Sequence, residues 1–251
     1  MKSATVRPFT TKKSMSCNDN GLQPRPTVSV IIPTLNEAGN LPFVLNTIPE
    51  WVDEIIVVDG RSTDDTERIA RLLNPGVKVV HELTPGKGAA LRAGLGAASG
   101  AYLIALDADG SMDGSRIGDF YAALQGGAEY VKGSRFATGG GSADITRIRR
   151  FGDWGICLLM RLLFGARFSD DSYGYFAVRA DRLSDIRIDT NGFEVETLIN
   201  VRAHRAGLRI VEVPCFEGNR INGVSTLSAF RDGLRIGKFL FRERLGLNRG
   251  S

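Results

Sequence analysis

The sequence predicts an α/β fold with a mostly parallel central sheet flanked by helices. Apolar runs of strand length alternate along the chain with segments of helix length, and several of these runs end in acidic or polar residues. Such alternation implies right-handed crossover connections between parallel strands. With 251 residues, of which 43% are hydrophobic, the chain can bury a sizeable core in one large domain or in two closely joined ones.

The strands and helices of the first part of the chain follow from these patterns. Residues 28–33 form a buried-type strand that ends at a proline, and a helix follows over about 40–47. Residues 55–58 form the second strand, and a polar turn caps the helix after it. The third strand covers 77–81, a helix rich in small residues covers 87–98, and the fourth strand covers 101–106.

Acidic residues follow three of the predicted strands, namely Glu37, Asp59 and Asp107. In sheets of this class, ligands bind beyond the carboxyl ends of the strands. Stability alone requires apolar strands and any polar turn, and it does not require a carboxylate at each strand end. We therefore expect this edge of the sheet to be a functional site.

The fourth strand ends in two carboxylates one residue apart, Asp107 and Asp109. If the strand continued through them, both would point to the same side. Two crowded like charges favour a hard divalent cation with oxygen ligands between them. The alternative is a structural one, in which Asp109 and Gly110 only form a turn.

The two familiar phosphate-binding loops, G-x-G-x-x-G and G-x-x-x-x-G-K-[ST], are absent after the strands. Lys87, between Gly86 and Gly88, opens a predicted helix, where a cation and free amides could meet a phosphate. By itself this tripeptide is a weak signal, since most such sequences are plain turns.

Composition sets the expectations for the rest of the chain. Residues 1–26 are polar and are expected to be a disordered leader. No apolar run reaches the roughly 18 residues of a membrane span, there is no signal peptide, and the three cysteines have no metal-ligand spacing, so a cytoplasmic protein with reduced thiols is expected. Residues 229–251 are expected to form a basic amphipathic helix and tail, which either packs on the domain or lies on an anionic membrane surface.

Five motifs occur in order along the chain: VSVIIPTLNE (28–37), IIVVDGRSTDDT (55–66), GKGAALRAG (86–94), LDADG (106–110) and KGSRF (132–136). Together they resemble the family 2 glycosyltransferases with the GT-A fold, a Rossmann-like fold that binds nucleotide-diphosphate sugars. Within that family they are similar to the dolichyl- and undecaprenyl-phosphate sugar transferases. The resemblance implies a single GT-A domain over 27–228, with a nucleotide-sugar half (27–135) and an acceptor half (136–228).

The resemblance also implies a set of donor-binding residues. The D-x-D motif matches Asp107, Ala108 and Asp109, whose two carboxylates would bind Mg²⁺ or Mn²⁺ bridging the donor diphosphate. The nucleoside-binding residues match Pro33, Thr34, Asn36, Glu37 and Asp59. Gly60 stands where the family usually has aspartate, so the motif does not decide whether the donor nucleotide is UDP or GDP. Arg220 matches an arginine that binds the diphosphate. Thr226 stands where lysine is usual, so one phosphate contact is either missing or supplied by Lys87.

On the acceptor side, the resemblance implies that Arg135 faces the acceptor phosphate. If the acceptor is a hydroxyl, inversion needs a general base, for which Asp171 is the first candidate and Glu196 the second. A phosphate acceptor is already anionic and needs none. The alternatives are that Asp171 belongs to a turn or cap and that Glu196 pairs with an arginine.

The resulting hypothesis is a metal-dependent, inverting glycosyltransferase with a UDP- or GDP-sugar donor and polyprenyl phosphate as the favoured acceptor. One alternative is transfer to a hydroxyl of a saccharide or small natural product, and another is a sugar-phosphate nucleotidyltransferase. A nucleic-acid-binding module is disfavoured, because acidic strand ends repel phosphates. The oligomeric state is left open, with a homodimer as one option, and peripheral contact with the inner face of the membrane is an option for the C-terminal helix.

Overall fold

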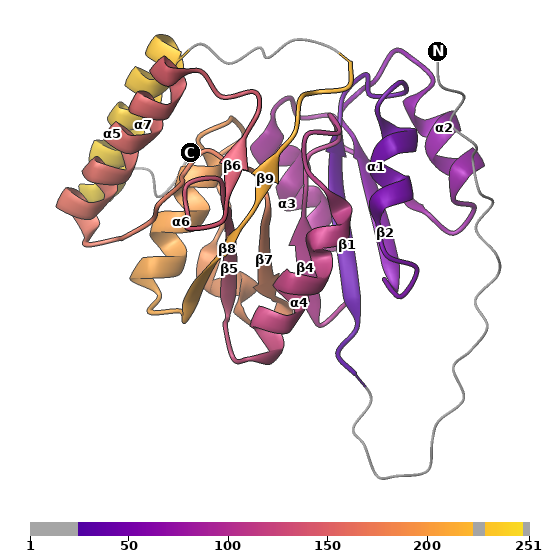
Figure 1. The fold of residues 1–251 in the computed structure, drawn as a ribbon, viewed down its shortest axis with the longest axis horizontal. Coiled ribbons are helices and arrows are strands. Elements are labelled where there is room, and N and C mark those ends of the chain that lie inside the picture. Colours follow the sequence, from indigo (N-terminus) through magenta and orange to yellow (C-terminus); the bar gives the residue numbers. More distant parts are fainter. Residues whose placement is uncertain (1–24, 223–228, 248–251) are drawn as a thin grey trace.

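The computed structural model describes residues 25–222 and 229–247, with the side chains of α7 described from residue 233 (Figure 1). Almost all of the predicted leader lies outside these residues, as does Thr226. Within the described ranges, no helix has the length and apolar character needed to span a membrane.

A seven-stranded sheet with the order β3-β2-β1-β4-β7-β5-β8 forms the centre of the molecule. Strand β7 is antiparallel to both of its neighbours, and the other pairs are parallel. The strands are β1 (Val28–Thr34), β2 (Glu54–Asp59), β3 (Lys78–His81), β4 (Tyr102–Ala105), β5 (Tyr130–Ser134), β7 (Phe176–Arg179) and β8 (Ile210–Pro214). A separate parallel pair is formed by β6 (Gly141–Ser142) and β9 (Phe216–Glu217).

Helices cover both faces of the sheet (Figure 1). Their bounds are α1 (Leu41–Thr47), α2 (Thr66–Leu73), α3 (Lys87–Ala97), α4 (Ile117–Gln125), α5 (Arg147–Phe164), α6 (Val195–Arg205) and α7 (Ala229–Arg244), with 3₁₀ helices at Gly114–Arg116 and Ala180–Ile186. Successive residues of β1 pack into different cores: Val30 and Ile32 face α1 and α4, whereas Ile31 faces α3. Burial on both faces explains why the strands read as continuous apolar runs.

The predicted strands and helices of the first half agree with the structure to within a few residues. One sheet spans both predicted halves, because β7 and β8 lie against β4 and β5. The antiparallel β7 was not predicted. The C-terminal helix packs along α5, with Leu240 fully buried, so packing on the domain is confirmed for that face of α7 (Figure 1).

Candidate active site

Side-chain hydrogen bonds join the loops that follow β1 and β2. The Asn36 Oδ1 atom accepts from the Thr63 amide at 2.8 Å, and the Asn36 amide donates to the Ser62 hydroxyl at 2.9 Å. Asn36 has a φ of 59°, a left-handed conformation for which asparagine is enriched. The Thr34 hydroxyl donates to the carbonyl of Val58 at 3.0 Å. Thr34 and Asn36 therefore hold the backbone of the predicted nucleoside site in a fixed shape.

Asp59 ends β2 directly beside Thr34 of β1, as Val58 lies beside Pro33. Its carboxylate is nearly buried and accepts a hydrogen bond from the Ser62 amide at 3.2 Å. The Gly60 amide donates to the Thr34 carbonyl at 2.9 Å, and a Cβ at position 60 would lie only 3.2 Å from the same oxygen. Glycine in place of the usual aspartate thus allows a close contact between the two loops.

Asp107 is bound by a lysine in this structure. The Lys87 Nζ atom at the start of α3 lies 2.6 Å from an Asp107 carboxylate oxygen and 2.5 Å from an oxygen of Glu196 on α6. Burial alone would lower the pKa of Lys87, but the two carboxylates outweigh burial and raise it above its ordinary value. Lys87 is therefore a fixed positive charge that connects the D-x-D motif to the acceptor half. The alternative that Glu196 pairs with an arginine is wrong as to the partner, because its partner in the structure is Lys87.

Gly174 makes room for this three-residue contact. A Cβ at position 174 would lie 2.6 Å from Lys87 Nζ, 2.8 Å from Asp107 Oδ2 and 2.9 Å from Glu196 Oε1. We expect Gly174→Ala to displace the lysine and to lower kcat by at least about tenfold, because charge at Asp107 would be repositioned. Steady-state kinetics would measure this, with Gly152→Ala on an open helix face as the control. Unchanged kinetics in Gly174→Ala would mean that the contact does not serve catalysis.

Asp109 is bound by the predicted diphosphate-gripping arginine. Asp109 Oδ2 lies 3.2 Å from Arg220 Nη1, and the same carboxylate accepts from the Ser111 amide and hydroxyl. The Ile221 amide donates to the Asp109 carbonyl at 3.2 Å. The segment that carries Arg220 thus lies directly along the D-x-D motif.

The two aspartates do not share one face of a strand, so the prediction that a strand points both to the same side is wrong. Strand β4 ends at Ala105, and Asp107 and Asp109 lie in the loop and turn that follow. Ala108 between them is buried in the core on the α1 side of the sheet. Each aspartate instead reaches its own cation, Lys87 or Arg220.

The acidic groups at this edge suit a hard divalent cation. Burial raises the pKa of Glu37, whose carboxylate accepts from Asn40 Nδ2 at 2.6 Å, and the negative charges of Asp109 and Asp107 raise it further. Carboxylate oxygens are the donors that Mg²⁺ and Mn²⁺ prefer. Among the described residues no three ligating side chains converge on one point, so Asp107 and Asp109 would hold an ion only together with ligands from the donor diphosphate and water.

Arg135 lies in the protein interior and does not face an open acceptor surface. Its side chain is 2% exposed and binds Asp170 through two nitrogen atoms, at 2.7 and 2.8 Å. It also contacts Glu217 of β9 at 3.2 Å and the Ser172 hydroxyl at 3.0 Å. These carboxylates more than offset burial and raise the pKa of Arg135. The buried acids occupy the guanidinium in this structure, and direct contact of Arg135 with an acceptor phosphate stays a prediction.

Asp171 is also enclosed, at 1% exposure. Its carboxylate accepts from the Thr197 hydroxyl at 2.5 Å and from Asn200 Nδ2 at 2.9 Å, both on α6. Burial raises the pKa of Asp171 to about 7, and the negative charge of Asp153 adds to the shift. The carboxylate thus connects the 170–172 segment to α6.

A family model and several known proteins match this chain. The family model described as glycosyl transferase family 2 matches residues 29–186. The chain belongs to glycosyltransferase family 2. It is 35% identical over 215 residues to the undecaprenyl-phosphate mannosyltransferase of Micrococcus luteus, covering 80% of this chain and 87% of the relative. It is 31% identical over 245 residues to the polyprenol monophosphomannose synthase of Mycolicibacterium smegmatis, covering 91% and 92%.

Among solved structures, this glycosyltransferase is similar to glucosyl-3-phosphoglycerate synthase from Mycobacterium tuberculosis in complex with Mn²⁺, UDP and glucosyl-3-phosphoglycerate. The TM-score is 0.70 at 26% identity, over 88% of this chain and 80% of that one. The GT-A fold expected from the motifs is confirmed, and so is the expectation of a glycosyltransferase.

The buried Asp171 gives the glycosyltransferase a predicted pH dependence. Its folded pKa of about 7 lies above the ordinary 3.8, so stability from this group is full below about pH 4 and is lost as pH rises through 7. Between pH 5 and 7, we expect the free energy of unfolding to fall by roughly 2 kcal/mol less in Asp171→Asn than in wild type. The measurement is denaturant unfolding of both proteins across this range, with Asp65→Asn as the exposed control. Parallel curves for wild type and Asp171→Asn would contradict the assignment.

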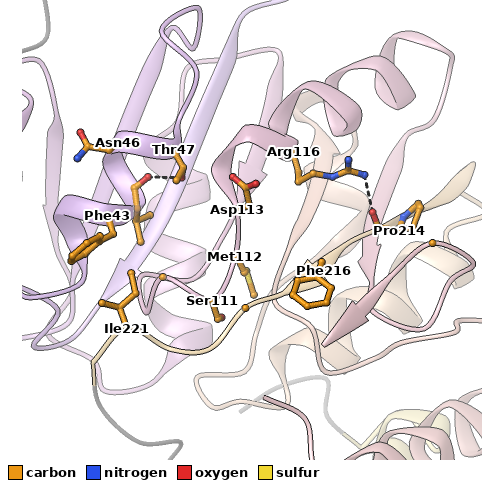
Figure 2. A pocket seen from close by; sticks show the side chains of 14 residues that line it. Phe43, Asn46, Thr47, Ser111, Met112, Asp113, Arg116, Pro214, Phe216 and Ile221 are labelled. Carbon is orange, nitrogen blue, oxygen red and sulfur yellow. Dashed lines mark hydrogen bonds between the residues drawn. The ribbon is translucent and has the colours of Figure 1, made fainter. Parts of the chain in front are cut away.

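A cavity of about 610 Å³ in the glycosyltransferase adjoins the D-x-D segment through Gly110 and Ser111 (Figure 2). Phe43 of α1 and Phe216 of β9 lie on either side of it, and Met112 and Ile221 also line it. No periodic pattern in the sequence indicated this cavity, because its walls come from four separated segments.

Other features of the glycosyltransferase site were not predicted. Asp170 and Glu217 are the partners of Arg135, and their role depends on contacts 35 and 82 residues away in the sequence. The only sequence signal for Gly174 was its position between two aromatic residues, Tyr173 and Tyr175. Both tyrosines are buried on the α1 side of the sheet.

Proposed function

We propose that this glycosyltransferase moves a sugar from a nucleoside-diphosphate sugar to the phosphate of a polyprenyl phosphate, with inversion at the anomeric carbon. Mg²⁺ or Mn²⁺ would be held by Asp107 and Asp109 together with the donor. The observation that carries the proposal is the pairing of these two aspartates with Lys87 and Arg220 at the carboxyl edge of the sheet.

The donor half of the proposal rests on the charges at this edge. Lys87 and Arg220 are cations already positioned within 3.2 Å of the D-x-D carboxylates. When a diphosphate binds together with a divalent cation, its anionic oxygens can pair with Lys87 and Arg220. The cation can then pair with the two aspartates. Support also comes from the structurally similar glucosyl-3-phosphoglycerate synthase, which was solved with Mn²⁺ and UDP.

In the proposed reaction, an acceptor phosphate oxygen attacks the anomeric carbon from the face opposite the diphosphate. The bond from that carbon to the diphosphate oxygen breaks, and its electron pair stays on the leaving nucleoside diphosphate. Arg220 and Lys87 stabilise the negative charge that develops there. A bound divalent cation supplies Lewis-acid stabilisation of the same charge.

The absence of a well-placed base among the described candidates favours a phosphate acceptor. A hydroxyl acceptor must lose a proton, which calls for an accessible carboxylate. Asp171 is enclosed by Thr197 and Asn200, and Glu196 is held by Lys87 at 2.5 Å. A phosphate needs no base, and the relatives named for undecaprenyl-phosphate and polyprenol transfer agree with this acceptor class.

A second candidate is transfer to the hydroxyl of a small phosphorylated molecule. It is favoured by the likeness to glucosyl-3-phosphoglycerate synthase, at a TM-score of 0.70. Glu196 would then be the base after Lys87 moves to the donor diphosphate. Membership of family 2 disfavours the nucleotidyltransferase alternative.

The test is mass spectrometry of reactions that contain Mn²⁺, a panel of UDP- and GDP-sugars, and either undecaprenyl phosphate or 3-phosphoglycerate. We expect one hexose to be added to undecaprenyl phosphate and none to 3-phosphoglycerate. Transfer to 3-phosphoglycerate alone would favour the second candidate and contradict the proposed acceptor.

A further inference from the structure

Helix α5 exposes a row of large apolar side chains. Ile148, Phe151, Trp154, Leu158 and Leu162 are between 37% and 75% exposed. Their spacing of three or four residues places them on one face of the helix. The Phe151 and Trp154 rings lie 5.5 Å apart between centroids, so the row is continuous at its centre.

This row is separate from the face by which α5 packs. Ile156 and Met160 are buried in the core on the α3 side of the sheet, together with Leu240 of α7. An exposed apolar row of this size on a folded domain indicates an interaction surface.

Helix α7 lies beside α5 (Figure 1) and also exposes large apolar side chains. Leu234 and Phe241 of α7, and Leu245 in the turn that follows the helix, are more than half exposed and are spaced seven and four residues apart. We call these three residues together with the α5 row the α5–α7 surface.

The charged residues of the two helices are distributed unequally. Basic side chains are exposed on both helices, namely Arg147, Arg150 and Arg161 on α5 and Lys238, Arg242 and Arg244 on α7. The acidic side chains described in these helices, Asp153 and Glu243, are buried, and Glu243 pairs with Arg202 at 3.0 Å. Among the side chains of this helix pair that the structure describes, the exposed ones are therefore largely apolar or cationic.

We propose that the α5–α7 surface docks on an anionic phospholipid bilayer. Apolar and aromatic side chains flanked by Lys and Arg are the features of helices that lie in the membrane interface. Tryptophan favours this interface because its ring is largely apolar and carries one polar N–H group. The inference rests on the proposed function, since a polyprenyl-phosphate acceptor is itself anchored in a bilayer.

The first experiment is co-sedimentation of the full chain with vesicles of phosphatidylcholine alone or of phosphatidylcholine and phosphatidylglycerol in equal parts. We expect binding to the anionic vesicles, weakened at least about tenfold in the double variant Phe151→Ser/Trp154→Ser. The matched control is Leu72→Ser/Leu83→Ser, which removes two equally exposed apolar side chains elsewhere and should bind as wild type does. Arg161→Gln/Arg242→Gln should lower both the binding and its dependence on salt.

Tryptophan emission gives a second readout that does not depend on the double variant. The chain has two tryptophans, Trp51 and Trp154. We expect anionic vesicles to shift the emission of Trp51→Phe to the blue and to leave that of Trp154→Phe unchanged. Equal shifts in both variants, or no binding of wild type to anionic vesicles, would overturn the inference.

A second copy of the chain is the alternative occupant. If wild type is a dimer by sedimentation velocity and Phe151→Ser/Trp154→Ser is a monomer, the surface is a dimer interface and the membrane inference is wrong. Failure of the proposed function is distinguishable from both outcomes: the protein would then bind anionic vesicles yet transfer no sugar to undecaprenyl phosphate within them. Conversely, transfer to a short-chain, water-soluble prenyl phosphate without vesicle binding would leave the function standing and remove the docking surface.

Discussion

Asp107→Asn is expected to lower kcat at least about 100-fold, which corresponds to roughly 3 kcal/mol of transition-state stabilisation. The substitution keeps the size of the side chain but removes the negative charge that faces Lys87 at 2.6 Å and that would bind the divalent cation. Donor binding should also lose its dependence on Mn²⁺. Initial rates and nucleotide titrations with and without Mn²⁺ measure both effects.

Asp65→Asn is the matched control for Asp107→Asn, because Asp65 is an exposed carboxylate that pairs with Arg68 on the surface. It should leave both rate and metal dependence unchanged. If Asp107→Asn retained wild-type turnover, the two aspartates would have only the structural role of a turn.

Arg135→Met is expected to destabilise the fold by about 3–5 kcal/mol, because it leaves buried carboxylates without their counter-ion. Asp170 and Glu217 would lose contacts of 2.7 and 3.2 Å, and Ser172 would lose a hydrogen-bond donor. Urea unfolding measures the loss, with Arg68→Met at an exposed ion pair as the control.

The same variant tests the role that the motif resemblance implied for Arg135. An arginine that contacts the acceptor phosphate would, when replaced, raise the KM for the acceptor and leave stability unchanged. That outcome would restore the direct role and would contradict the interior assignment made from the structure.

Local patterns in the sequence were enough to predict the first four strands and the acidic edge. Strands β1 and β2 are buried on both faces, so their apolar runs are unbroken, and Asp59 stands at the end of β2. The contact between Asp109 and Arg220 agrees with the motif expectation that this arginine lies at the diphosphate site. The reversed direction of β7 is set by its pairing with β4 and β5, and no local pattern reports that pairing.

Charge pairing in the site was harder to predict than the position of the charges. Lys87 and Glu196 are 109 residues apart, and Arg135 and Glu217 are 82 apart. Which carboxylate meets which cation depends on how β5, α6 and β9 are brought together in space. The exposure of the apolar row on α5 also depends on how the helix packs. An apolar residue in a helix can face either the core or the surface.

Asp107, Asp109, Lys87 and Arg220 together form the proposed donor site. Its most direct test is a thermal-shift panel of UDP, GDP, CDP and dTDP with their common sugars, each with and without Mn²⁺, on wild type and Asp107→Asn. A ligand that binds only the folded state raises the melting temperature. We predict a shift for one nucleotide class that requires Mn²⁺ in wild type and is lost in Asp107→Asn. No shift with any nucleotide, or the same Mn²⁺-dependent shift in both proteins, would contradict the assignment of these four residues to the donor site.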